Sequence, residues 1–521
     1  MSIRDQFARG LIGAASFLVK SSAATPSYDA ASNSVRLSGW NPGAEAITAI
    51  LQGNGSTLRR RARDTARKSP YADQALGRYV SNAIGTGIRP NSQHPDPAVQ
   101  TSIDDAFSRW CDEADADNVT NYFGLQALAV RSMMEGGDCF GRFRARRPED
   151  GLYVPFQVQL LESEMVPLEE SRRLANGNQV RAGVEFDAVG RRVGYHIYRN
   201  HPGDSAWAIG NNGRPVPVAA ANVAHVYRPL RPGQVRGVTG LATALLTLYE
   251  LDQYQDAELV RAKIASMITG FIEKKADEGG RPAFGGTKAV DSILEIMKLQ
   301  PGTIPVLAPG ESANLAQPPD TGAGVNDFIK QMLRRASSGS GVTYEQMTGD
   351  LSDVNYSSIR AGLLEFRREV EQFQRCFFIF QFCRPTWRRF IREAVFSGRI
   401  DAPDFKQNAH LYYDVSWTPN GFKWTDPQRE VVALIKAIRS GLISRPEAIR
   451  MSGYDPKKID EELARDRQAR IDQGLILDSD PEQVSGAGVT QARAAGSELP
   501  SADDDTELEH PDDEEHRRRS A

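Results

Sequence analysis

A short polar stretch in the second half of the chain, "TGDLSDVNYSS", holds the residues whose types and spacing come nearest to chemistry. Asp350 and Asp353 are two carboxylates three positions apart, and paired carboxylates can hold Mg²⁺. Gly349 and the serines give the stretch the look of a phosphate-binding loop. It contains no lysine, however, and carboxylates repel a phosphate unless a metal intervenes. No third acidic ligand lies near in the sequence, so a metal-dependent nucleic-acid-processing enzyme using Asp350 and Asp353 stays only as the alternative.

Other motifs for catalysis are missing from the sequence. The seven histidines form no H-E-x-x-H or H-x-H pattern. His196 and His225 lie in strand-like runs with no G-x-S-x-G motif, which favours core or hydrogen-bonded histidines. The glycine-rich runs "NAIGTGIRP" and "MEGGDCFGR" match no nucleotide-binding motif and are typical of a helix end and a turn. We therefore predict no catalytic residue, no metal ligand and no cofactor.

Composition and charge restrict the class of protein. The chain of 521 residues has a net charge of −4, which gives no global attraction to DNA. Its four cysteines, at positions 111, 139, 376 and 383, form no C-x-x-C pair, which indicates a reducing compartment without structural zinc. No apolar run approaches the roughly 20 residues that a bilayer requires. The run "GLIGAASFLVK" ends early at Lys20, so a flexible N-terminal arm is favoured over a secretory signal.

The order of elements shows what must position the polar stretch. A helical pattern with the basic cluster "RRRARDTARK" follows the arm, and a solvated or subunit-facing helix surface explains it better than DNA readout. Residues 152–228 then favour short strands, with a hairpin turning at 187–190 inside "VEFDAVGRRVGYHIY". Apolar residues at three- and four-residue steps predict a helix over 240–275, about 50 Å long.

A second set of helices flanks the polar stretch itself. The pattern predicts one helix near 325–338 and a long one from Tyr356, which Pro385 should end or kink. Asp426 with Pro427 and Ser444 with Glu447 open two later helices. The tail from 478 is polar and strongly acidic, which is typical of disorder.

Several blocks in this order resemble the lambda family of bacteriophage portal proteins. The block "VTYEQMTGDLSDVNYSSIRAGLLEFRREVEQFQ" carries the likeness most clearly. The others are "LRRRARDTARKSPYADQALGRYVSNAIGTGIRP", "GVEFDAVGRRVGYHIYRNHPG", "HVYRPLRPGQVRGVTGLATALL" and "GTIPVLAPGE". Together they extend over roughly residues 45 to 470, most of the chain.

The resemblance implies an α+β portal fold: a mixed α/β wing, a long helical stem, a small α/β clip and a helical crown, assembled as a ring. We map the chain onto it as an arm at 1–45, a wing at 46–237, a first stem helix at 238–275, a clip at 276–323, a second stem helix at 324–341, a tunnel loop at 342–356, a long helix returning to the wing at 357–425, a crown at 426–477 and a disordered tail at 478–521.

The resemblance also implies a function and partners. The chain would be a structural subunit of a ring, typically a dodecamer, at a unique capsid vertex, through which viral double-stranded DNA enters and leaves. Its partners would be the terminase large subunit, the major capsid protein and scaffold, and head-completion or tail-connector proteins, in the virion and, during assembly, in the host cytoplasm. No membrane is involved. The tunnel loop around the DNA would be formed by Glu345, Met347, Thr348, Asp350, Leu351, Ser352, Asp353 and Asn355.

The charge of this loop agrees with a conduit. Residues 343 to 358 include three acidic residues and no basic one, so the loop would not trap phosphates. Met347 and Leu351 would offer apolar contact to the DNA or to a neighbouring subunit. A scaffold or adaptor that never touches DNA is the third interpretation.

Overall fold

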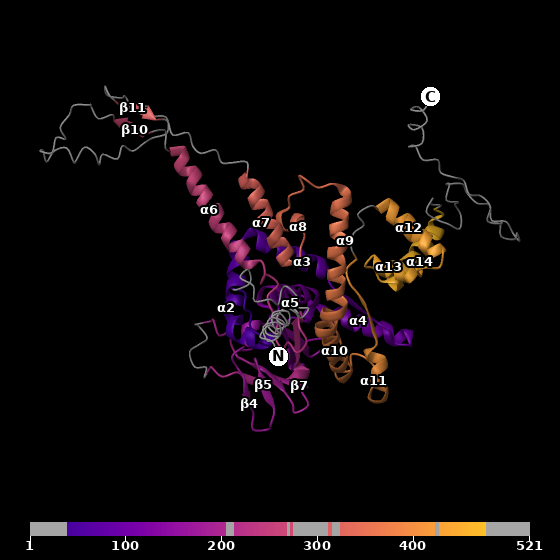
Figure 1. Cartoon of the computed structure of the whole chain (residues 1–521). Helices are drawn as coiled ribbons and strands as arrows, with labels where there is room; N and C mark the ends of the chain where they lie inside the picture. Colours follow the sequence, from indigo (N-terminus) through magenta and orange to yellow (C-terminus); the bar gives the residue numbers. More distant parts are fainter. Residues whose placement is uncertain are drawn as a thin grey trace, which may run out of the picture. The chain divides into compact units, whose positions relative to one another are not determined.

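The computed structural model describes residues 39–204, 213–267, 271–274, 311–314, 324–421 and 427–475. The chain divides into two compact units after Val432. Unit 1 combines helices with sheets, whereas the described part of unit 2 is helical (Figure 1). The expected arm up to residue 38, the tail from 478 and most of the expected clip lie outside the described residues.

The helices are α2 (Ile47–Lys68), α3 (Pro70–Ala83), α4 (Pro97–Glu113), α5 (Tyr122–Gly136), α6 (Leu245–Met267), α7 (Gly324–Ser340), α8 (Tyr344–Thr348), α9 (Tyr356–Gln372), α10 (Arg384–Phe396), α11 (Phe405–Tyr413), α12 (Pro427–Arg439), α13 (Arg445–Met451) and α14 (Pro456–Gln473). The strands are β1 (Arg89–Ser92), β2 (Asp138–Ala145), β3 (Phe156–Glu162), β4 (Arg172–Arg173), β5 (Gln179–Arg181), β6 (Val184–Phe186), β7 (Arg192–Ile197), β8 (Val216–Ala219), β9 (Val223–Tyr227), β10 (Phe271–Lys274), β11 (Glu311–Asn314) and β12 (Val415–Thr418). The short turns η3 (Pro148–Asp150), η4 (Ser163–Met165) and η6 (Ala220–Asn222) are 3₁₀, and η7 (Phe373–Cys383) is a π-helix.

Two antiparallel sheets carry the β-rich region of unit 1. One has the order β3-β2-β9 and the other the order β4-β5-β6-β7-β8. The predicted hairpin is confirmed, since β6 and β7 pair and the Gly190 N–H donates to the Asp187 carbonyl across the turn. Strand β2 was not predicted. Its first four residues are all buried, so the polar alternation that marks a half-exposed strand is missing.

The junction between α5 and β2 depends on one glycine. Gly137 has φ of 92°, and a Cβ there would lie 2.7 Å from the Gly237 carbonyl oxygen. Only glycine combines that backbone conformation with such a close approach. It thereby turns the chain from the buried helix α5 directly into the central strand β2.

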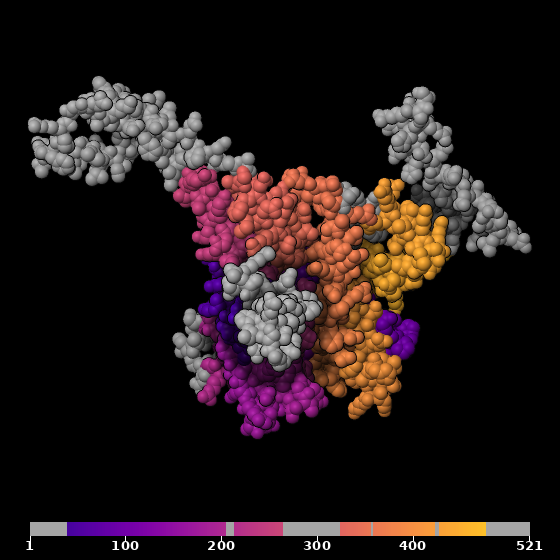
Figure 2. Space-filling model, in the orientation of Figure 1, coloured from indigo at the N-terminus to yellow at the C-terminus, as the bar shows by residue number. Residues whose placement is uncertain are grey.

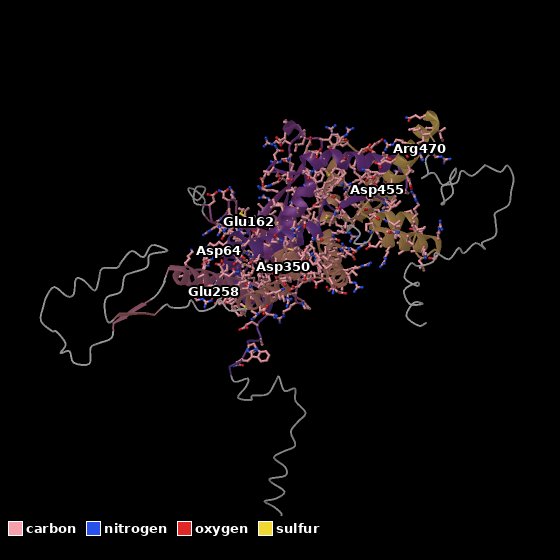
Figure 3. All side chains as sticks on the ribbon, turned by 90° about the horizontal axis from the view of Figure 1, so that it is seen from above. Asp64, Glu162, Glu258, Asp350, Asp455 and Arg470 are labelled. Carbon is pink, nitrogen blue, oxygen red and sulfur yellow. The ribbon has the colours of Figure 1, made fainter. Side chains whose placement is uncertain are left out.

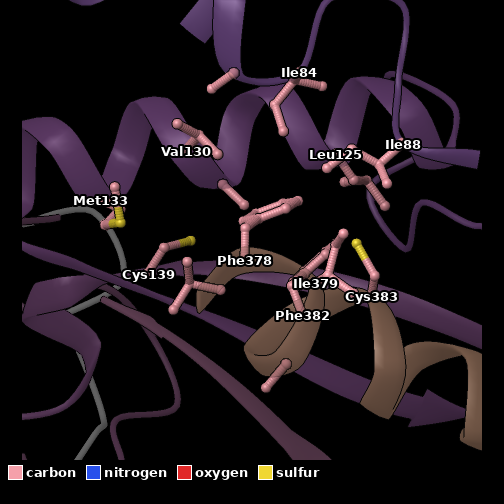
Figure 4. Close-up of a cluster of buried hydrophobic side chains, with 14 of the residues drawn as sticks. Ile84, Ile88, Leu125, Val130, Met133, Cys139, Phe378, Ile379, Phe382 and Cys383 are labelled. Carbon is pink, nitrogen blue, oxygen red and sulfur yellow. The ribbon is translucent and has the colours of Figure 1, made fainter. Parts of the chain in front are cut away.

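The largest core lies around α5 and the π-helix η7. In Figure 4, Phe378 and Phe382 of η7 extend toward Leu125 and Val130 of α5. All four of these side chains are less than 2% exposed. Burial of such side chains is the main force that stabilises unit 1, at roughly 1.5–3 kcal/mol for each large apolar side chain.

The helix that begins at Tyr356 does not end at Pro385, contrary to one branch of the prediction. Backbone angles stay helical through η7 and into α10, and α9 and α10 lie end to end in Figure 1. The Arg384 N–H reaches back five residues to the Ile379 carbonyl. Pro385 lies in the first turn of α10, directly after this π-helical junction.

The η7 side chains also satisfy neighbouring backbone. Gln374 donates to the Ala83 carbonyl at the end of α3, at 2.7 Å. Gln381 accepts the N–H of Tyr227 at 2.9 Å, on the edge strand β9. The π-helix therefore covers a sheet edge that would otherwise present a free donor.

The helix predicted over 240–275 is shorter than expected. Helix α6 ends at Met267, and Phe271–Lys274 form the strand β10, which pairs antiparallel with β11. The apolar steps that continue to Phe271 misled the prediction, because the partner strand lies some forty residues further along the chain. The helix expected at 324–341 agrees with α7.

Unit 2 contains helices with clear local start signals. Ser444 accepts the N–H of Glu447 at 3.3 Å and begins α13, as predicted. Asp455 caps α14, a third helix that the sequence analysis did not predict. Among the described residues of this unit only Ala448 is a buried hydrophobic residue.

Candidate functional site

The segment expected to form the tunnel loop contains more regular secondary structure than a loop. It connects α7 to α9, and its first part is the short helix α8. Thr343 accepts the N–H of Gln346, and the Gln346 side chain accepts the N–H of Thr343, a reciprocal capping box. Gly349, with φ of 73°, ends the helix in the left-handed conformation.

Two apolar residues of this segment lie in opposite environments. Met347 is 1% exposed and belongs to the main core, because α8 packs against α3 and α7. The expectation that Met347 offers contact to DNA or to a neighbouring subunit is therefore wrong. Leu351 is 60% exposed and lies at the tip of the following turn, so it remains available for such contact.

Asp350, whose place in unit 1 is labelled in Figure 3, organises this turn through its hydrogen bonds. One carboxylate oxygen accepts both the Ser352 hydroxyl at 2.6 Å and the Ser352 N–H at 3.0 Å. The other oxygen accepts the Tyr344 hydroxyl at 3.0 Å. These hydrogen bonds, chiefly the one from the Ser352 hydroxyl, lower the pKa of Asp350 to about 2. The carboxylate therefore stays ionised throughout the neutral range.

Asp353 has a basic partner that the sequence analysis did not foresee. The ammonium group of Lys330, on α7, forms an ion pair with its carboxylate. That contact raises the pKa of Lys330. The segment is acidic in sequence, but one of its charges is compensated from the neighbouring helix.

The other predicted residues have mostly local roles. Thr348 donates to the Tyr344 carbonyl at 2.8 Å and accepts the Asp350 N–H at 3.1 Å. Asn355 begins α9 by accepting the Ser358 N–H at 2.8 Å, as its position before the helix predicts. Glu345 is partly exposed in the first turn of α8. The structure thus leaves seven of the eight residues exposed or partly exposed along this segment and buries Met347.

The arrangement gives the metal alternative no support. Asp350 and Asp353 belong to no group of three possible metal ligands within the described part of the chain. Asp350 already accepts three hydrogen bonds, and Asp353 contacts an ammonium group. Divalent magnesium usually requires open carboxylate oxygens with several bound waters.

The basic helix α2 turns part of its charge inward. Arg59 is 6% exposed and donates to the Gly136 carbonyl at 2.9 Å. Arg63 forms ion pairs with Glu162 at 2.7 Å and with Glu164 at 2.8 Å. A solvated helix surface is therefore the wrong interpretation for Arg59, although Arg60 and Arg61 are exposed. The acidic residues of β3 and η4, which are distant in sequence, explain why part of this basic cluster faces inward.

Behind α2 lies a fully buried ion pair. Arg236 donates to both carboxylate oxygens of Asp138, at 2.5 and 3.1 Å, and both side chains are 0% exposed. It also donates to the carbonyls of Val166, Ala182 and Ser163, at 2.7 to 3.0 Å. Burial alone would raise the pKa of the Asp138 carboxyl, but Arg236 and His225 hold it well below its usual range. One arginine thus joins β2 to the segments that follow β3 and β5.

His225 completes this cluster as a neutral residue. Its Nε2 lies 3.4 Å from Asp138, and its ring stacks between Phe140 and Tyr227. Burial lowers the pKa of His225 to about 4, despite the neighbouring carboxylate. His196 is also buried, 3.2 Å from Glu185. Both histidines are core residues with hydrogen-bond partners, as predicted.

One group of three possible metal ligands lies elsewhere in the described residues. It consists of Glu162, Glu164 and His201. The guanidinium of Arg63 already contacts both carboxylates, so the group forms an ion-pair network rather than an open site.

None of the helices in the described part of the chain combines the length and apolar character of a membrane span.

Solved structures with a similar chain include two from a gene transfer agent. One is the virion of the native particle, with a TM-score of 0.43 and 13% identity over 77% of this chain and 94% of that chain. Another is the neck of the empty particle computed with C6 symmetry, with a TM-score of 0.45 and 14% identity over 79% of this chain and 98% of that chain.

Named relatives resemble the chain along most of its length. A "Probable portal protein" of Halomonas phage phiHAP-1 is 25% identical over 80% of this chain and 81% of its own. The "Portal protein" of Escherichia phage N15 is 24% identical and "Portal protein B" of Escherichia phage lambda is 23% identical, each over 84% of this chain and 89% of its own. The family profile described as "Phage portal protein, lambda family" matches residues 33–374. The chain therefore belongs to the lambda family of phage portal proteins.

Proposed function

We propose that the chain forms a ring, a dodecamer, at one capsid vertex, and that double-stranded viral DNA passes through its centre during packaging and ejection. In this proposal the terminase large subunit and later the head-completion and tail-connector proteins dock on the ring, and the major capsid protein and scaffold surround it. The role is structural and includes no catalytic step. It is carried out at the portal vertex of the virion, after assembly in the host cytoplasm.

The observation that carries the channel proposal is the turn between α8 and α9. It exposes Leu351 and Ser352 beside the ionised Asp350, and its tip has no basic side chain. Repeated around a ring, it would present an acidic and apolar collar to the phosphate backbone. Because each lysine that neutralises a phosphate strengthens nonspecific binding, such a collar suits sliding better than holding.

The boundaries of wing, stem, clip and crown remain part of this proposal. Helices α6 and α7 would form the stem, the described helices of unit 2 the crown, and β10 with β11 would belong to the start and end of the clip. The turn from Gly349 to Asn355 would form the tunnel loop between stem and wing.

The channel test adds positive charge without breaking the turn. Replacing Asp350 or Asp353 would remove local hydrogen bonds or an ion pair, so we choose the exposed tip. Leu351→Lys changes an exposed side chain that makes no hydrogen bond, so it should leave rings intact and reduce the DNA packaged per head at least severalfold. Leu351→Gln is the matched neutral control and should package nearly normally.

Native mass measurement and electron microscopy of both variants establish the assembly in the same experiment. A stable monomer, or a ring with a solid centre, would contradict the proposal and favour a scaffold that never contacts DNA. Intact rings in which the lysine variant packages as well as the glutamine control would remove this turn from the DNA path.

A further inference from the structure

A second surface of unit 1 combines positive charge with a cavity. The cavity has a volume of about 700 Å³ and is bounded by α10, η6, the start of β9 and the end of η7. Four arginines line it, at positions 384, 388, 389 and 392. Figure 2 shows the surface of α9, η7 and α10 as a strip of orange along one face of unit 1. No motif in the sequence distinguishes these arginines.

The arginines lie close enough together to repel one another. Arg384, Arg388 and Arg392 follow at four-residue steps and therefore share one face of α10, a spacing at which like charges destabilise a helix. Glu393 is their nearby acidic residue, and its carboxylate lies 2.8 Å from Arg389 and 3.4 Å from Arg392. Arg384 and Arg388 are exposed and form no ion pair with any residue that the structure describes. The cavity therefore carries an excess of positive charge.

One of the four side chains is already held in place. Arg389 is 13% exposed and donates to the Asn222 side chain at 2.8 Å, in addition to its contact with Glu393. Burial lowers the pKa of Arg389, and the neighbouring Glu393 only partly opposes this effect. A guanidinium has five N–H donors in a fixed plane, so those that remain are pre-positioned for an incoming carboxylate.

The rest of the cavity is apolar. Phe143, Val223 and Tyr413 contribute to its lining, and Phe380 stands at its margin with 63% of its side chain exposed. Peptide-binding surfaces commonly combine arginine with aromatic residues around an apolar pocket. A surface that binds only phosphates does not require an apolar lining.

We propose that this cavity binds an acidic peptide segment of a partner protein. Carboxylates of the segment pair with Arg384, Arg388 and Arg389, and an apolar side chain of the segment packs against Phe380. A cavity of about 700 Å³ accommodates a few side chains. The phosphates of a DNA duplex lie on a convex surface and fit an extended basic face better than this concave site. The proposal does not depend on the ring or its channel.

The test measures binding to the purified full-length protein by fluorescence anisotropy. The probe is a short fluorescein-labelled peptide of Asp and Glu residues around a central Leu-Phe pair. We expect R384E with R388E to weaken binding by about tenfold or more, since two charge-assisted contacts become repulsive. The matched control is R60E with R61E, which makes the same charge change on exposed positions of α2 and should alter affinity by about twofold or less.

A second variant tests the apolar contact. Phe380→Ala should weaken binding of the Leu-Phe peptide by about threefold or more. It should leave unchanged the affinity of a peptide in which Ser-Ser replaces Leu-Phe. Because Phe380 is exposed, its loss should not unfold the protein, and a circular dichroism spectrum verifies this.

Three results would overturn the proposal. The first is an equal loss of affinity in the α10 and α2 variants, which would mean that only net charge matters. The second is binding of a lysine-rich peptide as tightly as the acidic one. The third is tighter binding of a short DNA duplex that R384E with R388E abolishes, which would assign the cavity to nucleic acid instead.

Discussion

Helices α2 and α10 are both rich in arginine, yet they use it in opposite ways. On α2, Arg59 and Arg63 point into the protein and find a carbonyl and two carboxylates from η4 and its surroundings. On α10, Arg384 and Arg388 remain exposed without an ion pair among the described residues. The sequence of an arginine-rich helix does not reveal which use applies. The partners decide it, and the partners come from segments distant along the chain.

The difference should appear in stability measurements. Charges that are paired in the interior are costly to disturb, because removal of one partner leaves the other without compensation. Charges that lie unpaired on the surface can be removed at almost no cost. Three comparisons, in order of expected size, test this contrast. All are measured at one fixed protein concentration because assembly would change apparent stability.

The largest effect is expected behind α2, at Arg236. Arg236→Met leaves the Asp138 carboxylate buried without its bidentate partner, and we expect a loss of about 3–5 kcal/mol in the free energy of unfolding. Urea denaturation measures it. The double variant Arg236→Met with Asp138→Asn removes the unpaired charge and should recover part of this loss. A double variant no more stable than the single one would show that the charge is not the cause.

A smaller effect is expected from pH, through His225. The native pKa of about 4 lies below the ordinary value of 6.5, so the unfolded chain takes up the proton first as pH falls. Stability should therefore fall between pH 7 and pH 5, by about 2 kcal/mol from this residue. The variant His225→Asn, which cannot titrate, should show a shallower fall in the urea midpoint. An unchanged slope would place the pH dependence elsewhere.

The smallest effects compare the two helices directly. Arg63→Ala should cost about 1 kcal/mol, because its ion pairs are partly exposed to water. Arg388→Ala should change stability by less than about 0.5 kcal/mol, with stabilisation favoured by relief of repulsion along α10. Urea midpoints of the two variants make the comparison. Equal losses would mean that Arg388 has a partner and would weaken the case for an open cavity.

Features encoded by neighbouring residues were accessible from the sequence. The cap at Ser444, the turn after Asp187 and the start of α9 at Asn355 each depend on side chains within a few positions. Helix α8 belongs to the same class, because Thr343 and Gln346 have the spacing of a capping box.

Features that depend on contacts between residues distant in the chain could not be predicted from the sequence. The end of α6 was misplaced because β10 requires β11 as its partner. The charge of the turn after α8 was overestimated because Lys330 comes from another helix. Met347 was assigned to the surface because only the packing of α8 on α3 and α7 shows that it is buried. The arginines of α10 are visible in the sequence, but the cavity they line exists only in three dimensions.

The π-helix η7 has a consequence for how related chains diverge. Its hydrogen bonds reach five residues back, so the segment accommodates more residues per turn than an α-helix does. If residues are deleted and the segment rewinds as an α-helix, the direction in which α10 faces depends on the number deleted, because each α-helical residue turns the chain by roughly 100°. Homologues that differ in length across this segment would thus turn another side of α10 to solvent, even with an identical α10 sequence. Insertions and deletions in η7 would change which face of α10 is exposed without changing any residue of α10.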